Sequence, residues 1–384
     1  MAGHLPQSLR FRGRLLGLLL GCCIFLPGCV LVYRQQIKTA MQAPATHGRA
    51  RLAVQEGIPV LHLYGTAKEM AEQYGTLLKP ALRALSNYGR ALLPGATFDR
   101  FVAYARTQEP LLPGEIREQI KAAADSSGVP YEDLLAMNVV PRVRCTTLAV
   151  WGPATADGAL VMGRNADYFG MGLADRGSLI VVYHSRDEKP VVAITFLGML
   201  GAFAGINSDG VAFGNMLVFN ATGQTYQDGG LPIQLAMRIA AHRSADAESM
   251  AGELAGMKHV IPMNVMVADS RQALVLELGM GENCIRRGRE GVLAASNDFL
   301  EHPQRSGGVY CPRYNALLAT VAKYPGSMGA EEMKKALHAA MIPTMNIQAV
   351  VFEPGKMRMH VSINRVPAGA GPYRVFDLRK LLEG

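Results

Sequence analysis

The sequence is short of charge, because Asp, Glu, Lys and Arg make up only 18% of its 384 residues and the net charge is +8. Aromatic residues are also few, at 7%, with a single tryptophan. Apolar residues reach 49%, a composition that buries a core and excludes a disordered chain. The small basic excess is not gathered into a patch, so we expect no nucleic-acid partner. The length leaves room for one large domain or two ordinary ones.

The sequence also lacks the common cofactor motifs. No pair of cysteines has the C-x-x-C spacing of a metal site, and no glycine run completes a dinucleotide- or phosphate-binding loop. We therefore expect no metal and no organic cofactor. If Cys284 and Cys311 pair in an exported protein, Cys145 is left as an odd thiol that catalysis would explain. The alternative is that all three are small buried apolar residues.

An uncharged apolar run extends from Leu15 to Val32, behind Arg10, Arg12 and Arg14. Its length of about 18 residues is at the lower end of what spans a bilayer, and the positive-inside rule would place the following chain outside the cytoplasm. We predict that residues 1–34 are a signal-anchor, with the catalytic domain in the cell envelope, periplasmic or extracellular. Lipobox-like tetrapeptides make a lipoprotein signal the alternative, and a buried core helix is a third interpretation. In the lipoprotein interpretation, the candidate lipidated cysteines are Cys22 and Cys29.

The remaining chain divides at Cys145. Residues 35–51 are polar and contain Pro44 and Gly48, which predicts a linker. Residues 52–144 have mainly helical patterns, and residues 145–384 have runs of strands, then helices, then strands, which favours an α+β fold. The predicted helices are 67–93 with a break at Pro80, 115–127, 130–138, 231–242, 245–255, 313–323 and 330–341. The predicted strands are 146–151, 160–164, 179–184, 191–197, 211–219, 265–268 and 273–277, with 348–352 and 358–363 as a hairpin around Pro354-Gly355.

Cys145 begins the first predicted strand, a position that makes chemical sense if the chain is cut before it. A new α-amine would then lie beside the thiol, and its ordinary pKa near 8 suits a general base for its own side chain. The competing interpretation is a Cys-His protease. The histidines that follow Cys145 lie in no recognisable protease context, which disfavours this alternative.

The stretch Cys145-Thr-Thr-Leu-Ala-Val-Trp-Gly-Pro-Ala-Thr-Ala-Asp-Gly158, followed by Gly163-Arg-Asn-Ala-Asp-Tyr168, resembles the start of the mature chain in the acyl-coenzyme A:6-aminopenicillanic acid acyltransferase-like family. The choloylglycine hydrolases are relatives that share the Arg-Asn-x-Asp element. Segments 65–75 and 349–354 are also similar, so the resemblance covers roughly residues 57–367. It implies a four-layer αββα sandwich of the N-terminal-nucleophile (Ntn) hydrolase type, with self-cleavage between Arg144 and Cys145. Arg144 departs from the small or acidic residue that several relatives have there.

The resemblance also implies roles for Arg164 and Asp167. Asp167 would hold the α-amine, and Arg164 would lie near the thiolate, where its permanent charge lowers the thiol pKa. The plainer alternative is a salt bridge at the end of a strand.

Three further residues match positions in the same family. Asn215 would donate to the oxyanion together with a backbone N–H, and Asn297 would orient the amine and the polar groups of the site. Arg313 matches a downstream family arginine. The alternatives are a buried asparagine that ties a bulge together, an Asx-turn and a solvated arginine in the first turn of a helix.

The expected activity is attack by Cys145 on a linear amide or thioester of a small N-acyl compound, through an acyl-enzyme, with water or an amine as the acceptor. The expected partners are the small-molecule N-acyl substrate, an acyl-thioester donor, and a membrane reached through the N-terminal segment. The alternative is a non-catalytic lipoprotein or binding protein of the cell envelope that keeps the fold without the chemistry.

Overall fold

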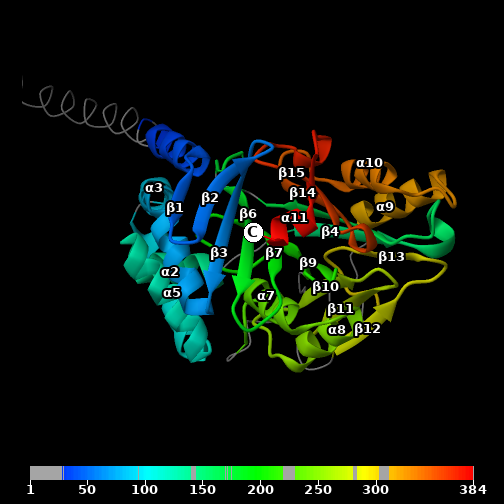
Figure 1. Cartoon of the computed structure of the whole chain (residues 1–384), viewed down its shortest axis with the longest axis horizontal. Coiled ribbons are helices and arrows are strands. Elements are labelled where there is room, and N and C mark those ends of the chain that lie inside the picture. The colour runs from blue at the N-terminus through cyan, green and yellow to red at the C-terminus, as the bar shows by residue number, and fades with distance from the viewer. Residues whose placement is uncertain are drawn as a thin grey trace, which may run out of the picture.

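Two β-sheets lie at the centre of the molecule. The computed structural model describes residues 28, 30–93, 95–139, 144–168, 170, 172–173, 175–218, 230–279, 283–301 and 311–383. Within these residues the strands form one sheet of ten and one of six. Helices cover the outer faces of both sheets (Figure 1). The α+β class predicted from the sequence is therefore confirmed.

The larger sheet has the order β1-β2-β3-β6-β7-β8-β9-β10-β11-β12. Its strands are β1 (Ala45–His47), β2 (Ala50–Gln55), β3 (Ile58–Gly65), β6 (Ser178–Ser185), β7 (Val191–Phe196), β8 (Ala204–Asn207), β9 (Ala212–Leu217), β10 (Met263–Ala268), β11 (Ala273–Leu278) and β12 (Asn283–Arg287). Strands β3 and β6 pair in parallel, with Val60 opposite Ile180. Segments on the two sides of Cys145 are thus joined within one sheet.

The smaller sheet has the order β13-β4-β5-β14-β15-β16. Its strands are β13 (Val292–Ala295), β4 (Arg144–Val150), β5 (Val161–Asp167), β14 (Asn346–Glu353), β15 (Arg358–Ile363) and β16 (Arg374–Asp377). Strands β14 and β15 pair antiparallel around the Pro354-Gly355 turn, as the sequence predicts. Strands β4 and β5, which carry Cys145 and Arg164, lie inside this sheet and not at its edge.

The helices include one at residues 30–42, before the first strand. The others are α2 (Ala67–Leu77), α3 (Lys79–Leu92), α4 (Ala96–Gln108), α5 (Gly114–Ser127), α6 (Tyr131–Val139), α7 (Ile233–Arg243), α8 (Ala247–Gly256), α9 (Pro312–Lys323), α10 (Ala330–Ala340) and α11 (Leu378–Glu383). Thr66 caps α2 in a capping box with Glu69, and Gly128 ends α5 at φ +69°. Helices α2 and α3 are separated at Leu78, and Pro80 lies in the first turn of α3, so the predicted break near Pro80 is confirmed.

Alternation along the strands assigns each side chain to one of three apolar layers. Val181 of β6 packs under the helices α2, α3 and α5–α8, whereas its neighbour Val182 faces the smaller sheet. Val351 of β14 packs under α9 and α10 on the far side of the smaller sheet. Figure 1 shows α9 and α10 on the opposite side of the molecule from α2, α3 and α5. The resulting order of layers is helices, sheet, sheet, helices.

The segment before Cys145 differs from its prediction. Residues 35–51, expected to be a linker, are helix up to residue 42 and then enter β1 and β2. Ile37 and Met41 are buried in the core, so two apolar side chains anchor a segment that is otherwise polar. Residues 52–144, expected to be mainly helical, also supply most of β2 and all of β3. Strand β3 was not predicted because it contains Pro59, and proline disfavours a central strand. Pro59 lies just before the residues of β3 that pair with β6.

The leader predictions fall mostly outside the described residues, because Arg10, Arg12, Arg14, Cys22 and Cys29 all lie there. Among the helices that are described, none has the length and apolar character needed to cross a bilayer. Within the described residues Cys145, Cys284 and Cys311 form no disulfide, so the suggested pairing of Cys284 with Cys311 is absent.

We expect the buried carboxylate of Glu353, at the end of β14, to make stability depend on acid pH. His360 Nε2 lies 2.9 Å from Glu353 Oε2, and this hydrogen bond, followed by that of Lys356, lowers the pKa of Glu353 from 4.5 to about 2. A depressed folded pKa stabilises the fold fully above the ordinary value and loses that effect as the pH falls towards 2. Chemical denaturation between pH 5 and about 2 should therefore show a steeper loss for wild type than for Glu353→Gln. The exposed Glu118→Gln exchange on α5 is the control and should keep the wild-type slope.

Candidate active site

The candidate site forms around Cys145, the second residue of β4. Arg144 is exposed, whereas Cys145 is completely buried. Cys145 faces the space between the two sheets, in the same apolar cluster as Ala149 and Ala166. The sequence-predicted position of the cysteine at the head of a strand is thus present in the structure, and the Arg144–Cys145 peptide bond lies where the chain passes from surface to interior.

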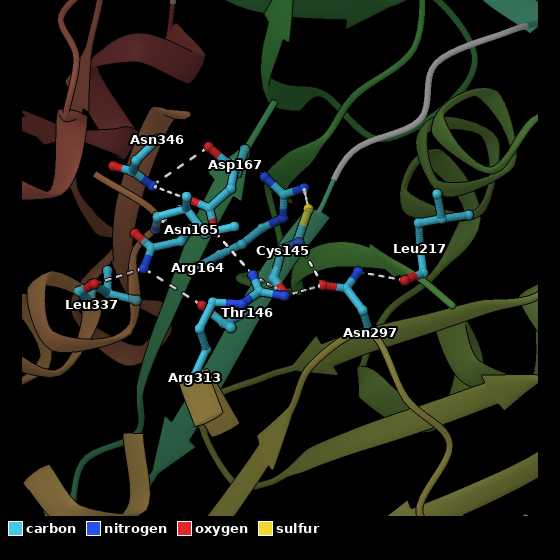
Figure 2. A network of polar contacts seen from close by, with 12 residues as sticks. Cys145, Thr146, Arg164, Asn165, Asp167, Leu217, Asn297, Arg313, Leu337 and Asn346 are labelled. Carbon is cyan, nitrogen blue, oxygen red and sulfur yellow. Dashed lines mark hydrogen bonds and ion pairs between the residues drawn. The ribbon is translucent and has the colours of Figure 1, made fainter. Parts of the chain in front are cut away.

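Arg164 is the closest charged partner of the Cys145 thiol. Strands β4 and β5 pair antiparallel, and the Arg164 side chain extends between the sheets so that its Nη2 lies 3.0 Å from Cys145 Sγ (Figure 2). The guanidinium also donates to the backbone oxygen of Asn215, from Nε at 3.2 Å and from Nη2 at 3.1 Å. Arg164 is 1% exposed and forms no ion pair with a carboxylate in the described part of the chain. A buried guanidinium without a counter-ion is costly, and a thiolate at Cys145 would supply one.

The thiol is nevertheless held in its neutral form in this uncut chain. Burial raises the pKa of Cys145 from 9.0 to about 11, and this outweighs the nearby charge of Arg164, which acts in the opposite direction. Burial likewise lowers the pKa of Arg164. Both shifts have the same cause, since a dry interior disfavours the charged form of either group.

Gly214 of β9 leaves the space that Arg164 occupies. A Cβ at this position would lie 2.5 Å from Arg164 Cδ, and Arg164 is fixed by its contacts to Cys145 and Asn215. We therefore expect Gly214→Ala to destabilise the fold by about 1–3 kcal/mol and to reduce self-cleavage, because the guanidinium must move away from the thiol. Thermal unfolding and the fraction of cleaved chain measure the two effects.

The matched control is Gly252→Ala inside α8, where an added Cβ meets nothing within 4 Å. A helical Gly→Ala exchange into open space should stabilise the protein by roughly 0.5–1 kcal/mol. A normal extent of cleavage in Gly214→Ala would contradict the importance of the Arg164 position.

Asp167 lies on the other face of β5 from Arg164, because residues three apart on a strand point in opposite directions. Its Oδ1 accepts from Asn346 Nδ2 at 2.8 Å and from the Ile342 backbone N–H at 3.2 Å. Its Oδ2 accepts from Arg313 Nη1 at 3.0 Å. The carboxylate is buried, and burial raises its pKa against these hydrogen bonds. The role implied by the resemblance, direct contact with the amine, differs from the contacts of Asp167 in the uncut chain.

Asn297 lies next to the backbone nitrogen of Cys145. The Cys145 backbone N–H donates to Asn297 Oδ1 at 3.1 Å, and Asn297 Nδ2 donates to the Leu217 backbone oxygen. Arg313 Nη2 donates to the same Asn297 Oδ1 at 2.5 Å. Arg313 therefore links Asp167 on one side to Asn297 on the other, and Asp167 acts on the Cys145 nitrogen through this chain of contacts (Figure 2).

The side-chain oxygen of Asn215 is held by a hydrogen bond, whereas its side-chain nitrogen has a weak partner. Its Oδ1 accepts from Arg164 Nη2 at 3.2 Å, which orients the side chain. Its Nδ2 has the Met263 sulfur, 4.0 Å away, as its partner among the described residues. A thioether is a weak acceptor, so this buried N–H retains most of its capacity to bind an oxyanion. Arg164 Nη1 is a second buried donor without a partner in the described part of the protein.

The structure thus brings together all the residues that the sequence singled out. Arg164 contacts the thiol of Cys145, and Asn297 contacts its nitrogen. Asn215 is bound to Arg164, and Asp167 and Arg313 form the adjoining ion pair. Sequence reasoning missed Gly214 and Asn346. Asn346 is a buried polar residue at the start of an apolar strand, and this pattern is visible in the sequence. The packing of Gly214 against Arg164 is not visible in the sequence.

Comparisons with known proteins show what the chain is similar to. The family model described as acyl-coenzyme A:6-aminopenicillanic acid acyl-transferase matches residues 154–313. The matched segment contains Arg164, Asp167, Asn215 and Asn297 and ends on Arg313. Protein dcd1B of Dictyostelium discoideum is 24% identical over 212 residues, which cover 47% of this chain. The match spans 42% of the length of that relative.

Several solved structures show a distant similarity to this chain. An N-acylethanolamine-hydrolysing acid amidase orthologue of Caenorhabditis elegans is 13% identical with a TM-score of 0.45, covering 55% of this chain and 93% of that one. A mutant conjugated bile acid hydrolase of Clostridium perfringens has 13% identity and a TM-score of 0.44, and the match covers 62% of this chain and 93% of that one. Penicillin V acylase of Agrobacterium tumefaciens is 13% identical with a TM-score of 0.42. The match covers 61% of this chain and 88% of that one. Scores this low carry no argument about the reaction. The family model confirms the resemblance seen in the sequence, and over residues 154–313 the chain is similar to the acyl-coenzyme A:6-aminopenicillanic acid acyl-transferase family.

Proposed function

We propose that this chain is a self-processing Ntn hydrolase or acyltransferase that uses Cys145 to cleave linear amide or thioester bonds of small N-acyl compounds. The observation that carries the proposal is the buried guanidinium of Arg164, which lacks a carboxylate partner among the described residues and lies 3.0 Å from the Cys145 thiol. A structural cysteine needs no such neighbour. A thiol that becomes a thiolate does, because the charge must be compensated in a dry interior.

The first step of the proposal is cleavage of the Arg144–Cys145 bond. Cys145 Sγ adds to the carbonyl carbon of Arg144, and the C–N bond then breaks, so that Arg144 becomes a thioester on Sγ and the Cys145 nitrogen becomes a free amine. Water hydrolyses this thioester, which releases the Arg144 carboxylate and restores the thiol. The exposed Arg144 beside the buried Cys145 places the carbonyl within reach of water. The amide nitrogen held by Asn297 becomes the α-amine.

Substrate turnover repeats the same chemistry on a separate amide. The α-amine takes the thiol proton, and Sγ attacks the substrate carbonyl. Asn215 Nδ2, with a backbone N–H, stabilises the oxyanion, and the leaving amine departs with the proton. The acyl group on Sγ then passes to water or to an acceptor amine. Asn297 and Arg313 fix the position of the α-amine, and Arg164 stabilises the thiolate.

The thiol pKa of about 11 in the uncut chain fits an inactive precursor. Burial disfavours the thiolate, so the neutral thiol predominates before the cut. Cleavage adds a titratable amine, with an ordinary pKa near 8, at the Cys145 nitrogen. In this proposal the cut therefore supplies the missing base.

We further propose that the protein acts outside the cytoplasm, tethered by its N-terminal segment. This rests on the apolar run at residues 15–32 and the arginines that precede it. Cell fractionation with protease protection tests it. A catalytic domain that stays in the cytoplasmic fraction would overturn the location and leave the chemistry untouched.

Intact mass spectrometry of the purified protein tests the chemistry. The wild type should give two fragments, the second beginning at Cys145, and the cleaved protein should turn over at least one compound in a panel of N-acyl amides and acyl thioesters. An uncut chain that is fully active would contradict the mechanism. A processed protein that binds panel compounds without turnover would favour a binding protein of the cell envelope.

A further inference from the structure

Asp298 lies beside the peptide bond that the proposed function cuts. Strand β13 pairs antiparallel with β4, and the ladder ends at Ala295. The same register, continued by two residues, puts Asn297 opposite Cys145. The hydrogen bond of 3.1 Å from Cys145 N to Asn297 Oδ1 shows that the two segments still run side by side there (Figure 2). One residue further along, this register puts Asp298 opposite Arg144.

The segment that carries Asp298 is held in place from two sides. Asn264 Nδ2 of β10 donates to the backbone oxygens of Ser296 and Asp298, at 3.0 and 2.8 Å. The buried carboxylate of Glu277, on β11, accepts from the backbone N–H of Leu300 at 2.8 Å. These contacts fix the backbone on both sides of Asp298 and leave its carboxylate out.

Two arginines act on the carboxylate of Asp298. Burial raises its pKa, whereas the charge of Arg313, a hydrogen bond from Ser296 and the charge of Arg144 lower it. Arg313 already forms an ion pair of 3.0 Å with Asp167. Because that pair is neutral as a whole, the remaining positive charge near Asp298 is that of Arg144. Two arginines and two carboxylates thus balance around the bond to be cut.

We infer, on the basis of the proposed function, that Asp298 recognises the positive side chain of residue 144 and thereby positions the carbonyl of that residue for attack by Cys145. Arg144 is exposed, and an attracting charge on a fixed segment restricts the orientations that its side chain adopts. Asp298 is a positioning residue, because it neither gives nor takes a proton. The bonds made and broken are those of the proposed self-cleavage. The consequence is that self-cleavage is selective for a basic residue at position 144.

Exchange of the two charges tests this recognition. Full-length chains are made by cell-free synthesis and sampled over time, and intact mass spectrometry gives the rate of cleavage before Cys145. Arg144→Lys keeps the charge and should be cut at nearly the wild-type rate. Arg144→Glu and Asp298→Lys each bring two like charges together and should slow cleavage by about tenfold or more. The double variant Arg144→Glu/Asp298→Lys restores the attraction and should recover to within about threefold of wild type.

Two further variants separate recognition from folding. Asp298→Asn removes the charge and keeps the shape, so the preference for arginine over glutamate at position 144 should fall to about threefold or less. Glu301→Lys is the matched control, because it makes the same change of charge at an exposed residue of the same segment. The control should keep both the wild-type rate and the preference.

A stability measurement on uncut protein keeps this inference separate from the proposed reaction. In the Cys145→Ala background, thermal unfolding of Arg144→Ala, Asp298→Ala and the double variant should show a coupling of about 1–2 °C in Tm. A wild type that stays uncut would refute the proposed reaction together with the role of Asp298. A wild type that is cut, with no coupling in Tm or with the full preference for arginine retained in Asp298→Asn, would overturn this inference alone.

Discussion

Replacing Cys145 with alanine is expected to leave a single uncut chain without activity towards N-acyl amides. The thiol is the nucleophile in both proposed steps, and Arg164 Nη2, 3.0 Å away, is directed at its sulfur. Removal of a catalytic nucleophile costs on the order of 10⁵–10⁶-fold in kcat, so the residual rate should equal the background. Intact mass spectrometry and a product assay on the same sample measure the two losses together.

The other free thiols provide the controls. Cys284 and Cys311 are half-buried, and Cys284→Ala and Cys311→Ala should cleave and turn over as the wild type does. Thermal unfolding of Cys145→Ala shows whether the fold is retained, because the exchange removes one buried sulfur from a site that otherwise stays packed. A folded Cys145→Ala protein that still splits between residues 144 and 145 would exclude self-cleavage by this thiol.

Local sequence patterns accounted for most elements that follow Cys145. The strands β4–β7, β9–β11, β14 and β15 combine β-branched and aromatic residues with clear turn signals, and the structure has them within a few residues of the prediction. The short strands β8, β12 and β13 were missed, because four or five residues give little periodicity to detect. Strand β3 was missed for a different reason, since its identity depends on pairing with β6, more than a hundred residues away.

The members of the site were predictable, but their contacts were not. The residues Cys145, Arg164, Asn215, Asn297 and Arg313 come from five separate elements or loops, and a family motif was needed to connect them. The contacts between these side chains depend on the alternation of residues along each strand and on the packing of the two sheets. The sequence suggested that Arg164 and Asp167 both reach Cys145. Their spacing of three on a strand sends Arg164 to the thiol and Asp167 to Asn346 and Arg313.

The two arginines of the site have different partners. Arg313 is neutralised by Asp167, and the pair positions Asn297 next to the Cys145 nitrogen. Arg164 forms no ion pair with a carboxylate among the described residues, so its charge is available to the sulfur. In the proposed mechanism, Arg313 therefore positions the base, and Arg164 stabilises the thiolate. The sequence alone places Arg164 on a strand and Arg313 on a helix, and it does not show that their partners differ.

Asn215→Ala is expected to reduce kcat by roughly 10²–10³-fold and to change KM much less. Loss of one oxyanion donor has this effect because the donor acts mainly on the charge that develops in the transition state. Asn215 Nδ2 suits the role, since its partner in the described structure is a thioether sulfur 4.0 Å away. The kinetics should be measured on cleaved protein isolated from the uncut fraction, because the same donor is expected to assist self-cleavage.

Two comparisons decide whether the loss arises from the donor or from the fold. Asn215→Asp keeps an oxygen to accept from Arg164 but replaces the Nδ2 donor, so it should lose as much kcat as the alanine variant or more. Asn207 is also fully buried, but its Nδ2 donates to Ala241 O and Ser244 O, both at 2.8 Å. Asn207→Ala should cost about 1–3 kcal/mol of stability and leave kcat near the wild-type value. If Asn215→Ala shows that same pattern, Asn215 is a structural residue and the oxyanion must be bound by other donors, of which the buried Arg164 Nη1 is one candidate.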